Sequence, residues 1–502
     1  RQRVPLTLPP TLAAGLMPHQ REAAEFVVAN GARGLVADDM GLGKTVTAIA
    51  VLAHAAQWPA LVLCPKSVKL NWKAELLRWL PEQLTPAQVQ VVEAGKDAVS
   101  PSARVLIETY QGARVRAPKG ELGRFRAVVC DESHHLKSPE AAQTRAILPL
   151  LRRAATAVLL SGTPALSRPY ELWTTASVVA PSVFRSHEEY GANLLSYSHE
   201  EYGARFCGGR DDWGNFSGAD NLAELEALLT KHVMVRRRKA DVDLRLPPKR
   251  RERVRVDGGG VDPALRERVN AKRRLGSLID SLRAGEMGEW EGRRMDRDAL
   301  QRRRQSMMTE LYLETAAAKQ AAAVAAVVAW CAAHPAGTKL LVFGHHKEML
   351  AALETALAAR GERAMKIDGG TGLARRQALT ERFQDAADAD APRVALLSMG
   401  AAGQGITLTA AHHVYFAELP WTPSALEQCI DRAHRLGQRA ALVRVTFLLY
   451  GPFDDEMWHI LENKRRVLEE SGVGVGLDGD GGHGGYGAGG SHGGDSGEEE
   501  ED

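Results

Sequence analysis

Three short stretches of this chain hold residues whose types and spacing could carry out phosphate chemistry. Hydrolysing a nucleotide requires a phosphate cradle, an acid that holds Mg²⁺ beside a general base, and cations that meet the charge of the leaving group. The stretches occur in a fixed order along the chain: DDMGLGKT (Asp38 to Thr45), DESHHLK (Asp131 to Lys137) and QCIDRAHRLGQ (Gln428 to Gln438). Together they predict a motor that is driven by ATP and uses Mg²⁺.

The first stretch follows an apolar, strand-like run and precedes the apolar helix expected at Val46 to Ala56, which is where a phosphate loop belongs. It departs from the usual GxxxxGK[ST] pattern because Asp38 replaces the first glycine. Glycines would let backbone N–H groups curl around phosphate, the lysine would reach the β and γ oxygens, and the threonine hydroxyl would ligate Mg²⁺. The ordinary alternative is a glycine-rich turn that caps a helix. The residues expected to hold the nucleotide here are Asp39, Gly41, Gly43, Lys44 and Thr45.

The second stretch ends a buried apolar run with two adjacent carboxylates, Asp131 and Glu132. Burying two acids side by side is costly without a cation to neutralise them. We expect Asp131 to hold Mg²⁺, and Glu132 to orient and deprotonate the attacking water. The alternative is a pair of acids in a solvated loop, but the phosphate loop upstream favours the metal-binding interpretation.

The third stretch places Arg432 and Arg435 three residues apart, which predicts that both side chains share one face of a helix. They could be surface arginines of an ordinary helix. Alternatively, they cross a cleft and stabilise charge on the transferred γ-phosphoryl group, a role worth ~10³ or more in rate. In that case two parts of the chain must close on each other, which would couple hydrolysis to domain motion.

These residues must be positioned by two α/β units, because short apolar runs alternate with helix-length segments in two separate series. Runs that are continuously apolar suit strands buried on both faces, as in a parallel sheet flanked by helices. The expected strands are 34–38, 60–64, 104–109, 127–132 and 157–162 in the first series, and 339–344, 364–369, 393–398, 413–417 and 443–449 in the second.

The predicted fold class is therefore α/β, with two parallel-sheet lobes. We expect residues 1–181 to form the first lobe, 182–315 a basic and helical insertion between the lobes, and 316–470 the second lobe. Residues 471–502 hold eight acids, no lysine or arginine, and many glycines. Such a composition cannot bury a core, so we expect this tail to be disordered.

The bulk composition sets limits on the class of protein. At 502 residues the chain is too long for one ordinary core, and 44% hydrophobic with 25% charged residues is typical of a globular protein. The net charge is +2, and removal of the acidic tail leaves residues 1–470 with +10. A basic body can hold a polyanion, although such a charge is also common in proteins that never touch nucleic acid.

Two features bear on the compartment. The longest apolar run, Ala321 to Ala333, is shorter than the ~20 residues that cross a bilayer, so we expect no membrane span. The five cysteines are scattered and form no CxxC pair, which argues against a zinc module or a disulfide framework and fits a reducing intracellular compartment.

From Met17 to Leu468 the chain resembles superfamily-two helicase-related motors of the SWI/SNF type. The resemblance implies two RecA-like lobes with an ATP site in the cleft between them. It rests on further motifs in that family's order, which are His19-Gln20, CPKSVKLNWKAEL (64–76), ETYQ (108–111), LLSGTPALSRPYELW (159–173), SMGAAGQGITLTAAHHVYFAELPW (398–421) and the family-specific ending RAHRLGQ.

The resemblance also implies roles for residues outside the three stretches. Gln20 would read the adenine, and Gly405 would help to hold the nucleotide. The residues implied to couple the nucleotide state to the grip on DNA are Ser161, Gly162, Thr163 and Gln428. The implied DNA contacts are Lys66, Lys69, Trp72, Thr109, Tyr110 and Thr407, with Arg236 to Lys239 as a basic brace between the lobes. For that charge run a solvated hinge face is the alternative; phosphate contacts of this kind would position a duplex without reading its sequence.

Within the family, DESHHLK and LVFGHHKEML (341–350) resemble the fork-remodelling branch, and residues 209–251 resemble its HepA-related annealing helicases. This implies a nuclear ATPase that is stimulated by branched DNA, such as stalled replication forks, and rewinds separated strands. The family's HARP modules, and any segment for a single-strand-binding protein, would precede Arg1. Because the chain does not begin with Met, we expect it to be a fragment or the product of an incompletely assigned gene. The alternatives are a nucleosome-remodelling ATPase and a non-catalytic DNA-binding scaffold, although a scaffold would not need the residues of the three stretches.

Overall fold

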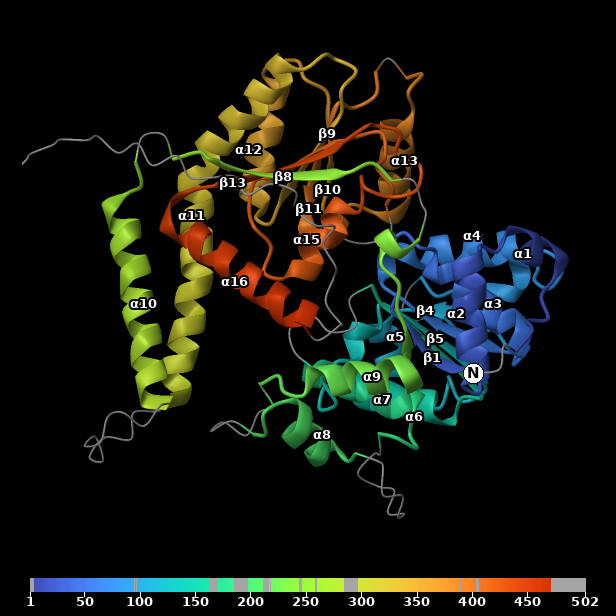
Figure 1. Cartoon of the computed structure of the whole chain (residues 1–502). Coiled ribbons are helices and arrows are strands. Elements are labelled where there is room, and N and C mark those ends of the chain that lie inside the picture. The colour runs from blue at the N-terminus through green and yellow to red at the C-terminus, as the bar shows by residue number, and fades with distance from the viewer. Residues whose placement is uncertain are drawn as a thin grey trace, which may run out of the picture.

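The structure is a computed structural model that describes residues 4–93, 95, 97–162, 169–184, 197–210, 216, 218–242, 246–257, 260–283, 297–388, 390–402 and 406–470. The predictions made for Thr163, Gly405 and the tail at 471–502 lie outside these residues. The described chain forms two α/β lobes, each built on its own parallel sheet (Figure 1).

The first lobe has a seven-stranded sheet in the order β3-β4-β2-β5-β6-β1-β7. Its strands are β1 (Arg33–Val36), β2 (Ala60–Leu63), β3 (Val89–Val91), β4 (Val105–Glu108), β5 (Ala127–Asp131), β6 (Thr156–Leu160) and β7 (Met234–Val235). Its helices are α1 (Pro10–Gly15), α2 (Pro18–Ala29), α3 (Lys44–Ala55), α4 (Lys69–Trp79), α5 (Tyr110–Arg116), α6 (Ala142–Arg153), α7 (Trp173–Val179), α8 (His199–Phe206) and α9 (Leu222–His232).

The second lobe has a six-stranded sheet in the order β10-β11-β9-β12-β13-β8. Its strands are β8 (Lys249–Arg255), β9 (Leu340–Gly344), β10 (Ala364–Ile367), β11 (Val394–Ser398), β12 (His413–Phe416) and β13 (Val443–Leu449). Its helices are α10 (Pro263–Arg283), α11 (Arg297–Ala333), α12 (Lys347–Ala358), α13 (Leu373–Gln384), α14 (Met399–Ala402), α15 (Pro423–Ile430) and α16 (Gly451–Glu470). Short 3₁₀ turns relevant below are η1 (Lys66–Val68), η4 (Ser133–Leu136) and η6 (Lys239–Asp241).

The apolar strands are buried on both faces, as their continuous apolar runs predict. In β2, Leu61 and Leu63 point into the core under α5 to α9, while Ala60 and Val62 point into the core under α2 to α4. The second sheet divides its strands in the same way between two cores. All ten expected strands are present, and the prediction of an α/β fold with two parallel-sheet lobes is confirmed.

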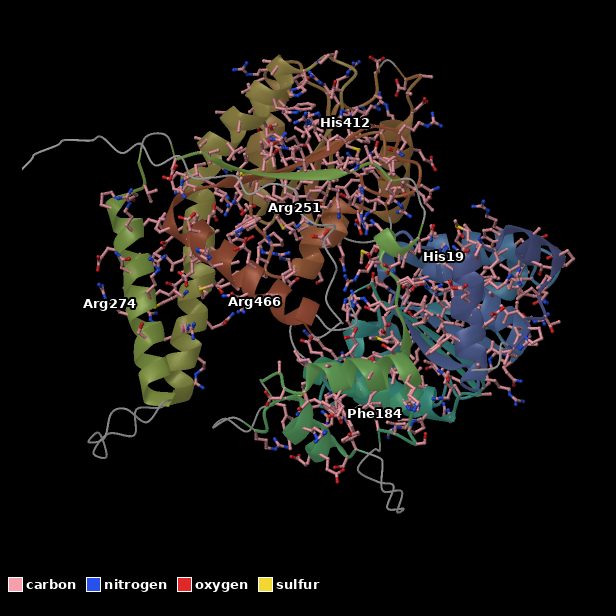
Figure 2. The ribbon with its side chains drawn as sticks, viewed as in Figure 1. His19, Phe184, Arg251, Arg274, His412 and Arg466 are labelled. Carbon is pink, nitrogen blue, oxygen red and sulfur yellow. The ribbon has the colours of Figure 1, made fainter. Side chains whose placement is uncertain are left out.

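The region expected to be an insertion between the lobes is shared out between them. The strand β7 pairs with β1, and Leu225 and Leu229 of α9 lie in a core of the first lobe, so that lobe extends well past residue 181. The strand β8 pairs with β13 at the edge of the second sheet. Residues 236–248 therefore form the described crossing between the lobes, apart from 243–245. The helices α10 and α11 form a hairpin that projects from the second lobe, where Arg274 lies far from His19 of the first lobe (Figure 2).

The helix α11 bears on the expectation that no segment spans a membrane. The stretch Arg302–Ala333 of α11 is long and apolar enough to cross a bilayer by length and composition alone, because it extends beyond the continuous apolar run. Part of this stretch packs in the second lobe, where Ala323, Val327 and Trp330 lie in one core with residues of β9. Such a position is the usual one for a core helix of a folded lobe.

Candidate active site at the lobe boundary

The phosphate loop lies between the end of β1 and the start of α3, in the strand–loop–helix setting that the sequence predicts. Gly41 and Gly43 adopt left-handed backbone angles, with φ of +89° and +82°, which glycine accepts without strain. A side chain at Gly43 would also overlap the amide of Gln20. The loop thus needs glycine at both positions, and α3 begins directly after it with Lys44 and Thr45, where the N-terminus of a helix favours an anion.

Lys44 folds back onto its own loop. Its Nζ donates hydrogen bonds to the backbone oxygens of Asp38, at 2.7 Å, and Asp39, at 3.2 Å. Burial lowers the pKa of the Lys44 ammonium, while the nearby carboxylates, led by that of Glu132, oppose this change. The ammonium therefore lies between the phosphate loop and the acid pair, where a phosphate group could contact it.

The two acids that open the loop are turned towards the crossing segment. Asp38 Oδ1 accepts hydrogen bonds from the backbone N–H of Arg237, at 2.9 Å, and from its Nε, at 3.2 Å. Asp39 Oδ2 accepts one from the backbone N–H of Lys239 at 3.0 Å. Burial raises the pKa of both carboxyls, and the neighbouring cations and hydrogen bonds work against it. The substitution of aspartate for the usual first glycine thus anchors the loop to the crossing segment.

The predicted acid pair sits at the end of β5. Asp131 Oδ1 accepts a hydrogen bond from the backbone N–H of Glu132 at 3.0 Å, and its Oδ2 accepts one from Trp72 Nε1 at 2.8 Å. Burial, followed by the charge of Glu132, raises the pKa of Asp131 to about 6. Burial would also raise the pKa of Glu132, but His134, whose Nδ1 lies 3.3 Å from Glu132 Oε2, and nearby cations hold that pKa below its usual value. The two environments therefore shift the pKa values of the two acids in opposite directions, as an acid and a base with different tasks require.

The residues present fit Mg²⁺. Asp131 and Glu132 are adjacent acids at a partly buried site, and two ionised carboxylates there need a cation beyond the single ammonium of Lys44. Thr45, the second residue of α3, adds a hydroxyl beside the loop. Carboxylate and hydroxyl oxygens are the hard ligands that Mg²⁺ prefers. Asp131 and Thr45 would hold the ion.

Arg432 and Arg435 reach the phosphate loop from the other lobe. Arg432 is 6% exposed, donates from Nη1 to the backbone oxygen of Ile406 at 3.1 Å, and brings Nη2 to 4.0 Å from Met40 Sδ in the loop. Arg435 Cβ lies 3.5 Å from the point where a side chain on Gly41 would begin. Burial lowers the pKa of both guanidinium groups. Neither residue is an ordinary surface arginine.

The expected helical placement of these arginines is wrong. The helix α15 ends at Ile430, and residues 431–436 follow as turns, so Arg432 and Arg435 do not share a helix face. Their turn is fixed by backbone contacts instead: the backbone oxygen of Arg432 accepts a hydrogen bond from Leu408 N at 2.8 Å. The Nε of Arg432 also donates to the backbone oxygen of Gln428 at 2.8 Å, which links this coupling residue to the arginine.

Gln20 and the coupling residues Ser161 and Gly162 of the first lobe lie against the phosphate loop. Gln20 Nε2 donates to the backbone oxygen of Leu42 at 3.1 Å, and its Oε1 accepts from Met17 N at 3.1 Å. Both ends of the amide are thus engaged within the protein, which gives Gln20 a positioning role; its reading of adenine stays a prediction. A Cβ on Gly162 would lie 2.8 Å from Met40 Cγ and 3.3 Å from Lys44 Nζ, and Ser161 is fully buried beside it.

Three of the residues predicted to contact DNA, Lys69, Trp72 and Tyr110, are buried. The Nζ of Lys69 donates to the backbone oxygen of Val92 and lies 3.6 Å from Glu108. Trp72 is 1% exposed and donates to Asp131, as described above, while Tyr110 donates from its hydroxyl to the backbone oxygen of Asp131 at 2.7 Å. None of these side chains is on a surface that DNA could reach in this conformation, because the polar atoms of Trp72 and Tyr110 hold the end of β5 and that of Lys69 is buried against Val92 and Glu108.

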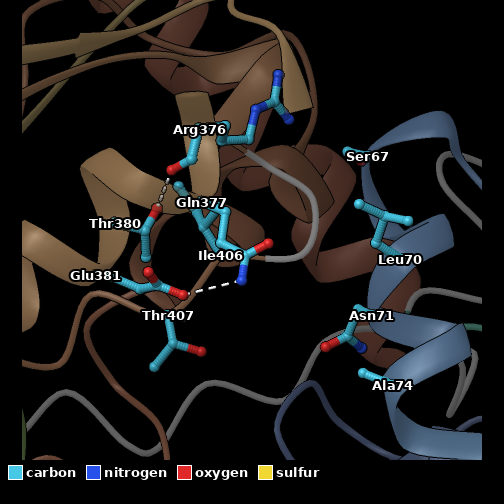
Figure 3. A pocket seen from close by; sticks show the side chains of 10 residues that line it. All are labelled: Ser67, Leu70, Asn71, Ala74, Arg376, Gln377, Thr380, Glu381, Ile406 and Thr407. Atoms are coloured by element: carbon cyan, nitrogen blue, oxygen red, sulfur yellow. Dashed lines mark hydrogen bonds between the residues drawn. The ribbon is translucent and has the colours of Figure 1, made fainter. Parts of the chain in front are cut away.

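The other predicted contacts lie on or near the surface. Lys66 is exposed in η1, and Thr109 is partly exposed and caps α5 by accepting a hydrogen bond from Gly112 N at 2.9 Å. Thr407 lines a cavity of about 300 Å³ between α4 of the first lobe and α13 of the second, where Asn71 and Gln377 face each other across open space (Figure 3). The full lining is Ser67, Leu70, Asn71, Ala74, Arg376, Gln377, Thr380, Glu381, Ile406 and Thr407.

The basic run from Arg236 to Lys239 bridges the lobes, but mainly through buried contacts. Burial lowers the pKa of Arg236 to about 10, Arg237 pairs with Asp38, and Lys239 is 9% exposed. Only Arg238 of this run is classed as exposed. These contacts agree with the expected basic brace between the lobes and not with a solvated hinge face. No local sequence pattern indicates these pairs, because they join residues about 200 positions apart.

The chain is similar to known proteins over most of its length. Residues 19–260 match the family described as SNF2-related domain, and residues 321–437 match the helicase conserved C-terminal domain. The chain is 36% identical over 467 residues to the Mus musculus protein named DNA annealing helicase and endonuclease ZRANB3. It is 34% identical over 465 residues to the Xenopus tropicalis SWI/SNF-related matrix-associated actin-dependent regulator of chromatin subfamily A-like protein 1.

These matches cover 92% of this chain but 41% and 45% of those relatives, so the chain spans less than half of their length. The solved Sulfolobus solfataricus SWI2/SNF2 ATPase core in complex with dsDNA covers 94% of this chain and 96% of its own, at 22% identity and a TM-score of 0.42, which is too low to transfer geometry between the two. The chain thus carries an SNF2-related domain followed by a helicase conserved C-terminal domain, and the candidate site lies where the two lobes meet.

Proposed function

We propose that the chain is an ATP- and Mg²⁺-dependent DNA translocase of the annealing-helicase type, which rewinds or remodels branched DNA such as stalled replication forks in the nucleus. One observation carries the proposal. The phosphate loop and acid pair belong to the first lobe, while Arg432 of the second lobe reaches within 4.0 Å of the loop. A site completed only when two lobes meet can convert hydrolysis into relative motion of the lobes.

Each group has a task in that reaction. The loop N–H groups and Lys44 would bind the phosphates, Glu132 would accept a proton from the attacking water, and Arg432 and Arg435 would stabilise the charge that develops on the transferred group. When bound, Mg²⁺ would neutralise phosphate charge as a Lewis acid. The low pKa of Glu132 keeps this carboxylate ionised near neutral pH, as a base must be.

The cavity between α4 and α13 supports DNA binding across both lobes (Figure 3). Its lining mixes apolar side chains with polar ones such as Asn71, Gln377 and Thr407 and includes one arginine and one glutamate, and it lies beside exposed Lys66. Such groups suit contacts to a sugar–phosphate backbone, which position nucleic acid without reading bases. A strand held there would be displaced whenever the two lobes move relative to each other. The name of one relative, DNA annealing helicase and endonuclease, supports the rewinding of DNA strands as the activity that we propose.

The catalytic part of the proposal is tested with Lys44→Ala and Glu132→Gln. Each change is expected to reduce DNA-stimulated ATP hydrolysis by at least about 100-fold, because each removes a group that acts on the transition state. Exposed Lys231→Ala and Glu93→Gln are the matched controls and should behave as wild type. Steady-state ATPase with and without DNA measures the effect. Unchanged turnover in both active-site variants would sink the proposal.

The DNA part is tested by adding negative charge to the cavity. Asn71→Asp should weaken binding of duplex DNA several-fold through repulsion of phosphates, and leave ATP binding unchanged. Asn270→Asp, at an exposed position of α10, is the matched control. Fluorescence anisotropy with fork, duplex and single-stranded DNA measures the affinities, and ATPase rates with the same DNAs and with nucleosomes rank the substrates. Equal affinity of both variants for every DNA would contradict binding in the cavity, and preferential stimulation by nucleosomes would favour a remodeller.

A further inference from the structure

Lys239 contacts both halves of the active site at once. Its backbone N–H donates to Asp39 Oδ2 of the phosphate loop at 3.0 Å. Its Nζ donates to Asp431 Oδ1 at 2.5 Å and to the backbone oxygen of His434 at 2.7 Å, both in the second lobe. Asp39 directly precedes Met40, and Asp431 directly precedes Arg432, so one residue joins the chain neighbours of the two groups that meet across the boundary.

The backbone around Lys239 is held firmly to the first lobe. The segment that follows β7 is fixed to the phosphate loop by Arg237, which donates twice to Asp38, and by the N–H of Lys239. The η6 turn, Lys239–Asp241, then holds the Lys239 backbone, because Arg238 N donates to Asp241 Oδ2 at 2.7 Å. A shift of the loop therefore moves the Lys239 side chain with it.

The contact of the Lys239 side chain with the second lobe depends on closure of the two lobes. Lys239 and Asp431 are 9% and 8% exposed, and a buried ammonium or carboxylate is tolerated only when it is paired. Burial would raise the pKa of Asp431, but the charges of Lys239 and Lys249 outweigh it and hold that pKa below its usual value. If the lobes separate, water replaces this pairing. The ion pair thus forms together with the closed boundary.

We propose that Lys239 is a positioning residue, which holds the turn of Asp431, Arg432 and Arg435 against the phosphate loop and so transmits movement of the loop to the second lobe. The inference rests on the proposed function, because it concerns the groups that would act in ATP hydrolysis. It differs from a DNA contact, since the Nζ is buried and its acceptors belong to the protein. It also differs from a pair that only adds stability, since it predicts a change in turnover and in closure.

The experiment uses Lys239→Met, Lys239→Arg, Asp431→Asn and the double variant Lys239→Met/Asp431→Asn in the full chain. Lys239→Met keeps the N–H bond to Asp39 and cuts only the contact with the second lobe. Misplacement of a catalytic group by about 1 Å can cost ~10²-fold, so we expect kcat with duplex DNA to fall between about tenfold and 100-fold. The ATP concentration at half-maximal rate and the Kd for DNA without nucleotide should change by less than about threefold. Lys239→Arg should recover part of the lost turnover, since it keeps the charge.

Closure is measured separately by energy transfer between dyes on cysteines introduced at exposed Lys119 and Arg360, one in each lobe; all five native cysteines are buried. A non-hydrolysable ATP analogue should raise the transfer efficiency of wild type more than that of Lys239→Met. Exposed Lys231→Met is the matched control for the substitution. The double variant removes both charges and leaves neither buried alone, so it tests the pairing even where one single variant folds poorly.

The outcomes separate the two proposals. A wild-type chain whose ATP hydrolysis does not respond to DNA would contradict the proposed function. The role of Lys239 would be overturned if the wild type responds normally to DNA and Lys239→Met has the same kcat and the same change in transfer efficiency as Lys231→Met. The double variant is also compared with the two single variants. If Lys239 and Asp431 act through one contact, the double variant loses that contact only once, so its rate loss is smaller than the product of the two single losses. A rate loss equal to that product would therefore overturn the role of Lys239.

Discussion

Replacing Asp131 with asparagine should make the metal-free protein more stable while it abolishes ATP hydrolysis. Burial and the charge of Glu132 raise the pKa of Asp131 from 3.8 to about 6 in the folded chain. The folded state therefore holds this proton more tightly than the unfolded state does. The stabilising effect of the bound proton is fully present below about pH 4, and it is lost as the pH rises through about 6.

The magnitude follows from that difference of about two pKa units. At 1.36 kcal/mol for each unit, ionised Asp131 costs the folded protein ~3 kcal/mol at pH 8. Asparagine escapes this cost, but its amide can accept only one of the hydrogen bonds that Trp72 and Glu132 donate to the two carboxylate oxygens. The lost bond is worth ~1 kcal/mol. We expect Asp131→Asn to gain ~2 kcal/mol at pH 8, and to gain nothing at pH 4.

Urea unfolding in the presence of EDTA, followed by circular dichroism at both pH values, measures this difference. Asp220→Asn, at an exposed position, should change the unfolding free energy by less than ~0.5 kcal/mol at either pH. The reasoning is refuted if Asp131→Asn is no more stable than wild type at pH 8, or if its gain is the same at pH 4 and pH 8.

Three further predictions concern neighbouring features. Trp72→Phe removes the donor to the acid pair and should lower ATPase kcat about tenfold while the Kd for DNA, measured by anisotropy, stays unchanged; weaker DNA binding at normal kcat would restore the surface role first expected for this residue. Gly43→Ala should abolish nucleotide binding in a titration with a fluorescent ATP analogue, because the new methyl group would overlap Gln20 and the φ of +82° disfavours alanine. Lys319→Met should destabilise the protein by ~3–5 kcal/mol in urea unfolding, because it leaves Asp454 buried without its 2.8 Å partner, whereas adding Asp454→Asn should recover much of the loss.

The sequence predicted the parts of the fold that depend on local pattern. Continuous apolar runs located ten strands, and the strand–loop–helix context located the phosphate loop, because both signals extend over neighbouring residues. The missed strands lack that pattern. The strand β8 has the sequence KRRERVR, which looks like a charge run, and it lies at the sheet edge where charged side chains reach solvent. The strands β7 and β3 are very short, with only two residues, Met234–Val235, and three residues, Val89–Val91.

The errors in the site have a different cause. Trp72 and Tyr110 were expected on a DNA surface because of where they lie in the chain, but the direction of a side chain depends on packing that a motif does not encode. Both point inwards and hold the end of β5. The pairs of Arg237 with Asp38 and Lys239 with Asp431 join residues 199 and 192 positions apart, and no local spacing reveals them.

The charges at the lobe boundary fall into two groups, and this division explains the acids at the start of the phosphate loop. Asp38 and Asp39 would repel a nucleotide if they faced it, yet their hydrogen bonds are directed to the crossing segment, at Arg237 and Lys239. Those acids offset the charge of the crossing segment. Lys44, in contrast, is left with backbone oxygens of the loop as its hydrogen-bond acceptors, and Arg432 makes backbone contacts beside it. A cation held at the phosphate loop in this way can meet phosphate oxygens, so the acidic start of the loop separates the cations that hold the lobes together, Arg237 and Lys239, from Lys44, which would act on the nucleotide.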